Sequence, residues 1–121
     1  MEEKINEQIS LSVENGIAVV CYYNPPVNAT NSEVYDAFTD LFHRLDARDD
    51  INVVVLKTKG KGFMAGNDIK DLKTHTPKSH AAYQQKLIDA FESIVQCRYP
   101  VIGEVQGYAL GAGFVFAACC D

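Results

Sequence analysis

Two glycine-rich segments hold the residues whose types and spacing could do chemistry. The first spans residues 62–70 (GFMAGNDIK), and the second spans residues 100–113 (PVIGEVQGYALGAG). Each precedes a stretch with helical character, so each leaves backbone N–H groups free at the start of a helix, where the helix dipole favours negative charge. Two such amides that converge on one point would form an oxyanion hole. The loss of one donor from such a hole typically costs about 3–4 kcal/mol of transition-state stabilisation.

Either segment alone also fits an ordinary turn between a strand and a helix, with glycine chosen for its range of φ. A phosphate-binding loop is a second alternative, but residues 107–113 have neither the GxGxxG spacing nor the lysine of the GxxxxGK[ST] pattern. The occurrence of both segments in one chain favours the anion-stabilising interpretation.

Other side chains that often carry chemistry lack partners in the sequence. His43, His75 and His80 stand at neither metal nor triad spacing, and we expect none of them to be catalytic. Glu104 lies on a predicted strand, where an exposed or ion-paired carboxylate is expected. The four cysteines form no CxxC pair, so reduced, buried thiols are the preferred interpretation. They are Cys21, Cys97, Cys119 and Cys120.

Length and composition fit one domain of a globular protein. The chain has 121 residues, of which 47% are hydrophobic and 22% charged. No stretch approaches the roughly 20 apolar residues that cross a bilayer, and the acidic start MEEKINE does not resemble a signal peptide, so a cytoplasmic protein is expected. A net charge of −5 disfavours nucleic acid and membrane surfaces as partners. Lys57, Lys59 and Lys61 form either a solvated loop or a contact for a small polyanion.

Strands and helices alternate around the two segments. A hairpin with an Asn15-Gly16 turn is predicted over residues 8–23, and a helix follows a capping box at residues 30–33 and ends near Arg48. The later elements are a strand at 52–56 covered on both faces, one helical turn at 68–72, a helix at 78–96, a strand at 101–105 and a buried helix at 114–120. The predicted buried faces of the long helices are Val34, Phe38, Leu41, Phe42 and Leu45, and then Leu87, Ile88, Phe91, Ile94 and Val95.

This order predicts an α/β fold in which the loops at the strand ends face a common crevice. Residues 114–120 are apolar on all sides. We therefore expect further protein to cover this helix, and the chain to be part of a longer domain.

The motifs together resemble those of one family. Phe63-x-Ala65-Gly66-x-Asp68-Ile69-Lys70, followed by residues 100–102 (PVI), 107–113 (GYALGAG) and a closing Cys120-Asp121, is similar to the enoyl-CoA hydratase/isomerase (crotonase) family. Asn28-Ala29 also matches the family pattern, so the similarity covers essentially the whole chain. The resemblance implies a crotonase-like spiral of strand-strand-helix units, truncated at about half the family domain. Residues 1–121 would then be the N-terminal part of a single acyl-CoA-binding domain.

The resemblance also implies the site. The backbone amides of Asn67 and Ala112 would form the oxyanion hole, and the substrate would be a coenzyme A thioester, with no permanently bound cofactor and no metal. The lysines at 57, 59 and 61 could then meet the CoA phosphates. The intact protein would be a homotrimer or hexamer. The residues expected to contact CoA are Ala65, Asp68, Ile69, Lys70 and Gly111.

One position departs from the family pattern. Hydratases of the family carry a general acid/base glutamate where this chain has Val115. The resemblance therefore favours double-bond isomerisation, decarboxylation or related enolate chemistry over two-glutamate hydration, with a carboxylate supplied later in the chain. Asn67-Asp68 also resembles the Gly-Asn-Asp stretch of some Δ3,Δ2-enoyl-CoA isomerases. A catalytically inactive acyl-CoA-binding module and an interaction module that reuses the fold are the alternatives.

Overall fold

The computed structural model describes residues 2–121, in which a five-stranded sheet is covered by helices. The strand order is β1-β2-β3-β5-β7. The first two pairings are antiparallel, whereas β3–β5 and β5–β7 are parallel. The strands are β1 Glu2–Lys4, β2 Ile9–Glu14, β3 Ile17–Tyr22, β5 Val53–Thr58 and β7 Val101–Glu104. The predicted α/β class is confirmed.

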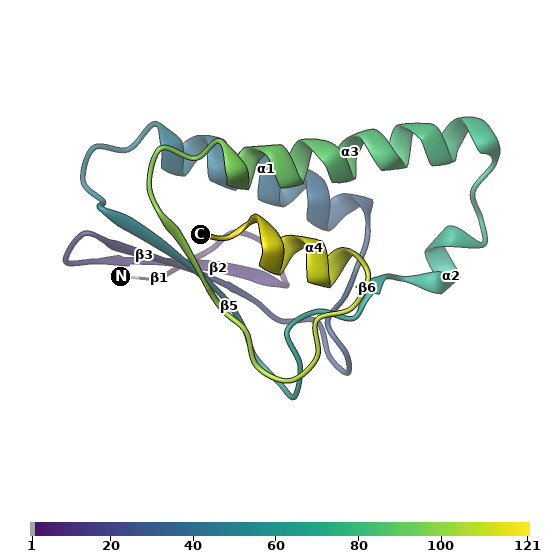
Figure 1. Ribbon diagram of the computed structural model, residues 1–121, viewed down its shortest axis with the longest axis horizontal. Coiled ribbons are helices and arrows are strands. Elements are labelled where there is room, and N and C mark those ends of the chain that lie inside the picture. Colours follow the sequence, from purple (N-terminus) through teal and green to yellow (C-terminus); the bar gives the residue numbers. More distant parts are fainter. Residues whose placement is uncertain (1) are drawn as a thin grey trace.

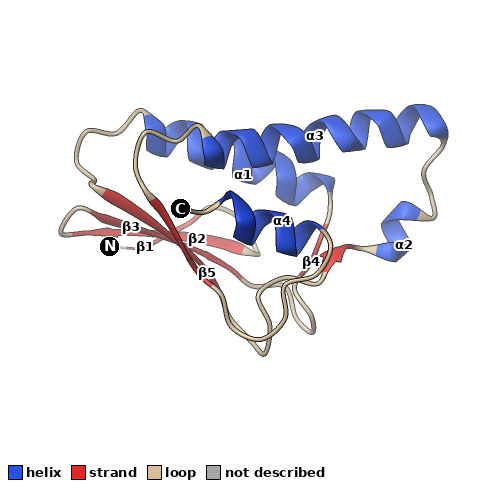
Figure 2. Cartoon of the chain, in the orientation of Figure 1, coloured by secondary structure: helices blue, strands red, loops and turns tan. Residues whose placement is uncertain are grey.

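Helices α1 (Ser32–Asp46), α3 (Pro77–Val95) and α4 (Ala112–Cys119) lie together on one side of this sheet (Figure 1). The short helix α2 (Ile69–Leu72) and a small parallel pair, β4 (Ala29–Thr30) with β6 (Gly66–Asn67), lie at the end of the molecule where the loops gather (Figure 2). The core fills the space between the sheet and the three longer helices. At its centre Phe116 of α4 is fully buried, with ring centroids 5.3 Å from Phe38 and 4.8 Å from Phe91.

The predicted hairpin is confirmed. Glu14 pairs with Ile17 across a turn in which Asn15 and Gly16 have φ of 52° and 79°. Helix α1 also buries all five predicted side chains, and Tyr35 in addition. Its start was misplaced, however: the N-cap is Asn31, whose side chain accepts from the Val34 amide at 3.1 Å.

Helix α1 ends at Asp46 with Ala47 as C-cap, slightly before the predicted end. Helix α3 matches the predicted bounds within one residue, with Leu87 and Ile94 buried. Two other predictions for α3 were wrong, because Ile88 is 44% exposed and Val95 is 64% exposed. The buried face of α3 is formed by Tyr83, Leu87, Ala90, Ser93 and Ile94, and these two side chains fall outside it.

Coverage of the sheet is less complete than predicted, and α4 is partly exposed, as expected of a helix that needs further protein to cover it. On β5, Val54 and Leu56 are buried but Val55 is only half-buried, since the helices cover one face of the sheet. On α4, Phe114 and Val115 are exposed. All four cysteines are free and half-buried, where buried thiols had been predicted. Within residues 2–121, no helix is long and apolar enough to span a membrane.

Candidate functional site

The two glycine-rich segments lie side by side. The first segment follows β5, and the second contains β7 and the loop after it. Because β5 and β7 are neighbouring parallel strands, the two loops start at the same end of the sheet. The Phe63 amide donates to the Tyr108 carbonyl at 2.8 Å, and the Leu110 amide donates to the Met64 carbonyl at 3.0 Å. Met64 and Ala109 form a parallel bridge between the same stretches. The structure thus joins the two segments that the sequence singled out.

Asn28 holds the first segment in shape. It is buried and has φ of 56°. Its Nδ2 donates to the carbonyls of Lys59 at 2.8 Å, Gly62 at 3.0 Å and Phe63 at 3.2 Å. Its Oδ1 accepts from the Asn24 amide at 2.7 Å. The segment therefore curls around one amide side chain.

Two glycines allow the segments to come so close. Gly66 has φ of +93°, and a Cβ there would lie 2.8 Å from the Leu110 carbonyl oxygen. A Cβ on Gly113 would lie 2.3 Å from the Met64 carbonyl oxygen, closer than any real Cβ contact. Because neither side chain is present, the start of α4 packs directly on β6. A Cβ on Gly66 would also lie only 3.3 Å from the Ala112 nitrogen, so that nitrogen is next to Gly66.

The Asn67 amide lies on the open edge of β6. Asn67 is paired with Thr30 of β4, and the next amide, that of Asp68, donates to the Thr30 carbonyl at 2.8 Å. Successive N–H groups of a strand point to opposite sides. The Asn67 N–H therefore points away from β4.

The Ala112 amide stands at the start of α4. Gly111 is the N-cap, with φ of 55° and no side-chain hydrogen bond. The Gly113 amide donates to the Leu110 carbonyl at 2.8 Å, and the Val115 amide donates to the Gly111 carbonyl at 3.3 Å. The Ala112 amide donates no hydrogen bond to any group in residues 2–121. Both predicted oxyanion residues are thus beside Gly66.

The predicted CoA contacts are sequence neighbours of Asn67 and Ala112. Ala65 is half-buried and its amide donates to the Asn28 carbonyl at 3.3 Å. The Asp68 carboxylate caps α2 by accepting from the Lys70 amide at 3.0 Å. Ile69 is 67% exposed, and Lys70 and Gly111 are exposed.

Charged residues near the loops are partly paired. Lys57 forms an exposed ion pair with Glu104 at 3.7 Å, which fits the expectation for that carboxylate. Lys59 and Lys61 are exposed. Val115 is 37% exposed on α4 and carries no proton-transfer group.

Sequence reasoning missed a polar cluster beside Asn67. The hydroxyls of Tyr35 and Tyr83 both donate to the Asn67 Oδ1. Burial raises the pKa of both phenols, so both stay protonated and remain donors. Both tyrosines lie on the apolar faces of their helices, where an aromatic residue is ordinarily a core residue, so the sequence held no signal for this contact.

His75 and His80 also find partners that their spacing did not predict. Their Nδ1 atoms are 3.2 Å apart, and the His75 Nε2 lies 3.7 Å from the Asp71 carboxylate. The ring centroid of His75 is 4.7 Å from that of Tyr83. His43 is exposed on α1, on the polar side as predicted. Among residues 2–121, no group of three or more metal-ligating side chains is arranged to hold a metal ion.

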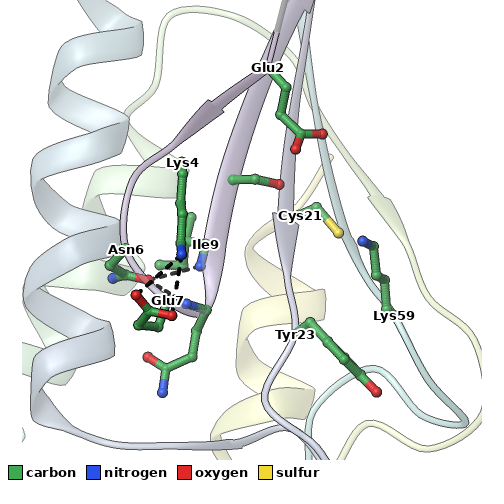
Figure 3. Close-up of a pocket in the computed structure, with 10 residues that line it drawn as sticks. Glu2, Lys4, Asn6, Glu7, Ile9, Cys21, Tyr23 and Lys59 are labelled. Atoms are coloured by element: carbon green, nitrogen blue, oxygen red, sulfur yellow. Dashed lines mark hydrogen bonds and ion pairs between the residues drawn. The ribbon is translucent and has the colours of Figure 1, made fainter.

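A separate hollow of about 210 Å³ lies against β1, β2 and β3 (Figure 3). Some of the polar groups that line it already have partners within the protein. Lys4 forms an ion pair with Glu7 at 3.2 Å, and the Asn6 Oδ1 accepts from the Ile9 amide at 2.8 Å. Burial raises the pKa of the Cys21 thiol, which makes it a poor nucleophile. This hollow takes no residue from the two segments. We therefore assign the candidate site to the segments.

The fold and the paired segments define an α/β protein whose candidate ligand site lies where two loops that follow parallel strands meet. The family profile described as enoyl-CoA hydratase/isomerase matches residues 12–121. The chain belongs to the enoyl-CoA hydratase/isomerase family.

Curated relatives and solved structures are similar to this chain over nearly all of its length. It is 33% identical over 105 residues to a (7aS)-7a-methyl-1,5-dioxo-2,3,5,6,7,7a-hexahydro-1H-indene-carboxyl-CoA hydrolase of Mycobacterium tuberculosis, covering 86% of this chain and 42% of the relative. It is 31% identical to a probable enoyl-CoA hydratase of Bacillus subtilis, and the match covers 93% of this chain and 44% of the relative. The chain therefore spans about half the length of the curated relatives it matches.

Solved structures agree with this assignment. An enoyl-CoA hydratase/carnithine racemase from Magnetospirillum magneticum superposes with a TM-score of 0.90 at 30% identity, covering 96% of this chain and 45% of the other. An enoyl-CoA hydratase from Geobacillus kaustophilus superposes with a TM-score of 0.92 at 24% identity, covering 100% of this chain and 46% of the other. At this identity the likeness supports the fold alone. The predicted crotonase-like fold, present over about half of the family domain, is confirmed.

Proposed function

We propose that this chain carries the acyl-CoA site of an enoyl-CoA hydratase/isomerase-type enzyme, in which the backbone amides of Asn67 and Ala112 hold the thioester oxygen. The observation that supports this is the pairing of the two glycine-rich segments, with the Leu110 amide 3.0 Å from the Met64 carbonyl. That pairing brings the Ala112 nitrogen beside Gly66, the residue before Asn67. The CoA part of the substrate would contact Ala65, Asp68, Ile69, Lys70 and Gly111.

Removal of a proton next to a thioester leaves an electron pair that delocalises onto the carbonyl oxygen. Two N–H donors aimed at that oxygen stabilise the enolate more than the neutral thioester, so they lower the barrier. The amides come from a short edge strand and from the first residue of α4. The buried Phe116 anchors α4 from within the core, which fixes the second donor.

Among enolate reactions we favour double-bond isomerisation, or a related reaction such as decarboxylation. Isomerisation breaks the C2–H bond of a 3-enoyl thioester and forms a C–H bond at C4, so one base that takes and returns the proton suffices. Two-glutamate hydration needs two carboxylates, and Val115 stands where the resemblance places the first. The B. subtilis relative is named a probable hydratase, so hydration has to be measured beside isomerisation.

The same valine favours one alternative, a module that binds acyl-CoA without turnover. Calorimetric titration of the intact protein with crotonyl-CoA and acetyl-CoA, together with assays of 3-enoyl-CoA isomerisation and 2-enoyl-CoA hydration, separates the two. Binding with isomerisation supports the proposal. Binding with neither turnover favours the module, hydration alone contradicts the preferred reaction, and no CoA binding contradicts both functions.

Asn67→Pro tests the first amide. The substitution removes the N–H, and because that N–H points away from β4, it breaks no hydrogen bond of the small sheet. We expect kcat to fall about 100-fold or more. Asn67→Ala, which keeps the backbone N–H, is the matched control, and its kcat should fall much less. Unchanged turnover in a folded Asn67→Pro variant would rule out this assignment.

A further inference from the structure

The residue that supplies the first amide is held by a weak backbone framework. Strand β6 is two residues long and pairs only with the equally short β4. The residue before Asn67 is Gly66, whose φ of +93° belongs to a region with few barriers for glycine. Backbone pairing at Asn67 is therefore limited to one short register and the Asp68 N–H bond to the Thr30 carbonyl, so a further contact would help to fix the direction of the Asn67 N–H.

That second support is the Asn67 side chain. Its Oδ1 accepts from the hydroxyls of Tyr35 and Tyr83, which come from α1 and α3. The Tyr35 oxygen also lies 2.6 Å from the Thr30 Oγ1. Each hydroxyl has one hydrogen, so if Tyr35 donates to Asn67, Thr30 must donate to Tyr35. The hydrogens then run from Thr30 to Tyr35 to Asn67, and the Tyr83 hydroxyl, which lies 3.4 Å from that of Tyr35, donates to the same Oδ1.

Tyr83 is itself held in place on several sides. It is 3% exposed. Its ring centroid is 5.6 Å from Tyr35 in an edge-on arrangement, 4.7 Å from His75 and 5.9 Å from His80. The two imidazoles contact each other through their Nδ1 atoms at 3.2 Å. A phenol enclosed in this way has little rotational freedom, so it can fix the group to which it donates.

We propose that Tyr83 is a positioning residue for the site: by donating to the Asn67 Oδ1 it fixes the direction of the Asn67 N–H. The inference rests on the proposed function for its catalytic consequence, but the contact can be tested without turnover. Tyr83 does not touch the reacting atoms. It acts through Asn67, so its effect depends on the Asn67 side chain.

Tyr83→Phe is the cleaner of the two tyrosine variants. It removes the long 3.4 Å contact between the two hydroxyls but leaves Tyr35 bonded to both Asn67 and Thr30. In the intact protein we expect kcat to fall roughly tenfold, with KM within about twofold, since the donor is misdirected while the CoA contacts remain. Hydrogen exchange of the Asn67 backbone N–H should be faster in Tyr83→Phe than in the unsubstituted protein. Tyr99→Phe removes a hydroxyl bonded to the distant Arg48 carbonyl and is the matched control.

A double-mutant cycle separates positioning from other roles. Asn67→Ala should reproduce the effect of Tyr83→Phe on kcat, and the double variant should be no slower than Asn67→Ala alone. An additional tenfold loss in the double variant would overturn the inference, because Tyr83 would then act by another route. Unchanged exchange of the Asn67 amide in Tyr83→Phe would overturn it irrespective of activity. Faster exchange in a protein that binds no CoA would support the contact and contradict the proposed function.

Discussion

At the scale of single residues, Asn28 combines two properties that few side chains share. Its backbone takes φ of 56°, a left-handed conformation that asparagine tolerates better than most residues. Its amide group offers both donors and an acceptor, and it uses them on the carbonyls of the first glycine-rich segment and on the Asn24 amide. The position of residues 62–66 thus depends on a residue more than 30 positions earlier in the chain.

Asn28→Ala should lower the free energy of unfolding by about 3 kcal/mol. The substitution removes the Asn28 donor from the buried carbonyls of Gly62 and Phe63, of which Gly62 keeps only the 3.3 Å bond from the Thr58 hydroxyl, and it places alanine at positive φ. Urea denaturation measures the change. Asn52→Ala, at an exposed position, is the control and should change stability by less than about 0.5 kcal/mol. Equal stability of the two variants would contradict the role given to Asn28.

Some of the site could be predicted at this scale, and some could not. The glycine-rich segments are recognisable because backbone amides are presented by a local pattern of glycines that the sequence displays directly. The contacts of Asn67 with Tyr35 and Tyr83 join residues 32 and 16 positions apart. Helical periodicity assigns a tyrosine to a buried face but does not say which polar atom its hydroxyl reaches, so this cluster needed the structure.

At the scale of secondary-structure elements, the start of α1 illustrates how packing overrides a local motif. Thr30 to Glu33 fits a capping box, and Asn31 alone is also a good cap. The structure uses Asn31, because Thr30 is already a strand residue of β4 whose hydroxyl bonds to Tyr35. Both alternatives give nearly the same helix. The sequence therefore predicted the element correctly and its first residue wrongly.

Removing the cap should weaken α1 by a predictable amount. Asn31→Ala deletes the acceptor for the Val34 amide and should cost about 1 kcal/mol of unfolding free energy, whereas Asn31→Ser should restore most of it. Glu33→Ala should change stability by less than about 0.5 kcal/mol, because the predicted box is not formed. Thermal and urea unfolding would measure these differences. A larger loss for Glu33→Ala than for Asn31→Ala would mean that the box forms in solution.

At the scale of the whole molecule, the structure explains why several burial predictions were wrong. Apolar patterning indicates that a residue can be buried, but burial itself requires protein on that side. Within residues 2–121 the helices cover one face of the sheet (Figure 1). Five of the large apolar side chains left exposed lie on β7, on α4 and on the segment between them. They are Ile102, Val105, Leu110, Phe114 and Val115. The curated relatives are about twice as long as this chain.

Buried tyrosines make the molecule sensitive to alkali, with Tyr22 as the clearest case. Tyr22 is fully buried and donates to the Ala29 carbonyl at 2.6 Å, and burial raises its pKa to about 12. The folded state therefore keeps a proton that the unfolded state loses near pH 10, so this stabilisation is complete below about pH 10 and is lost as the pH rises towards 12. The shift of about two pKa units corresponds to at most about 2.7 kcal/mol.

We therefore expect the unfolding free energy from urea titrations to fall steeply between pH 10 and 12. Tyr22→Phe should be less stable at neutral pH, through the lost hydrogen bond, but its stability should depend less steeply on pH in this window. Tyr23 is 43% exposed, so Tyr23→Phe should keep the pH dependence of stability of the unsubstituted protein. Lysine deprotonation affects all three proteins alike, so the difference in slope isolates Tyr22. Identical slopes for Tyr22→Phe and Tyr23→Phe would show that the buried phenol does not cause the loss.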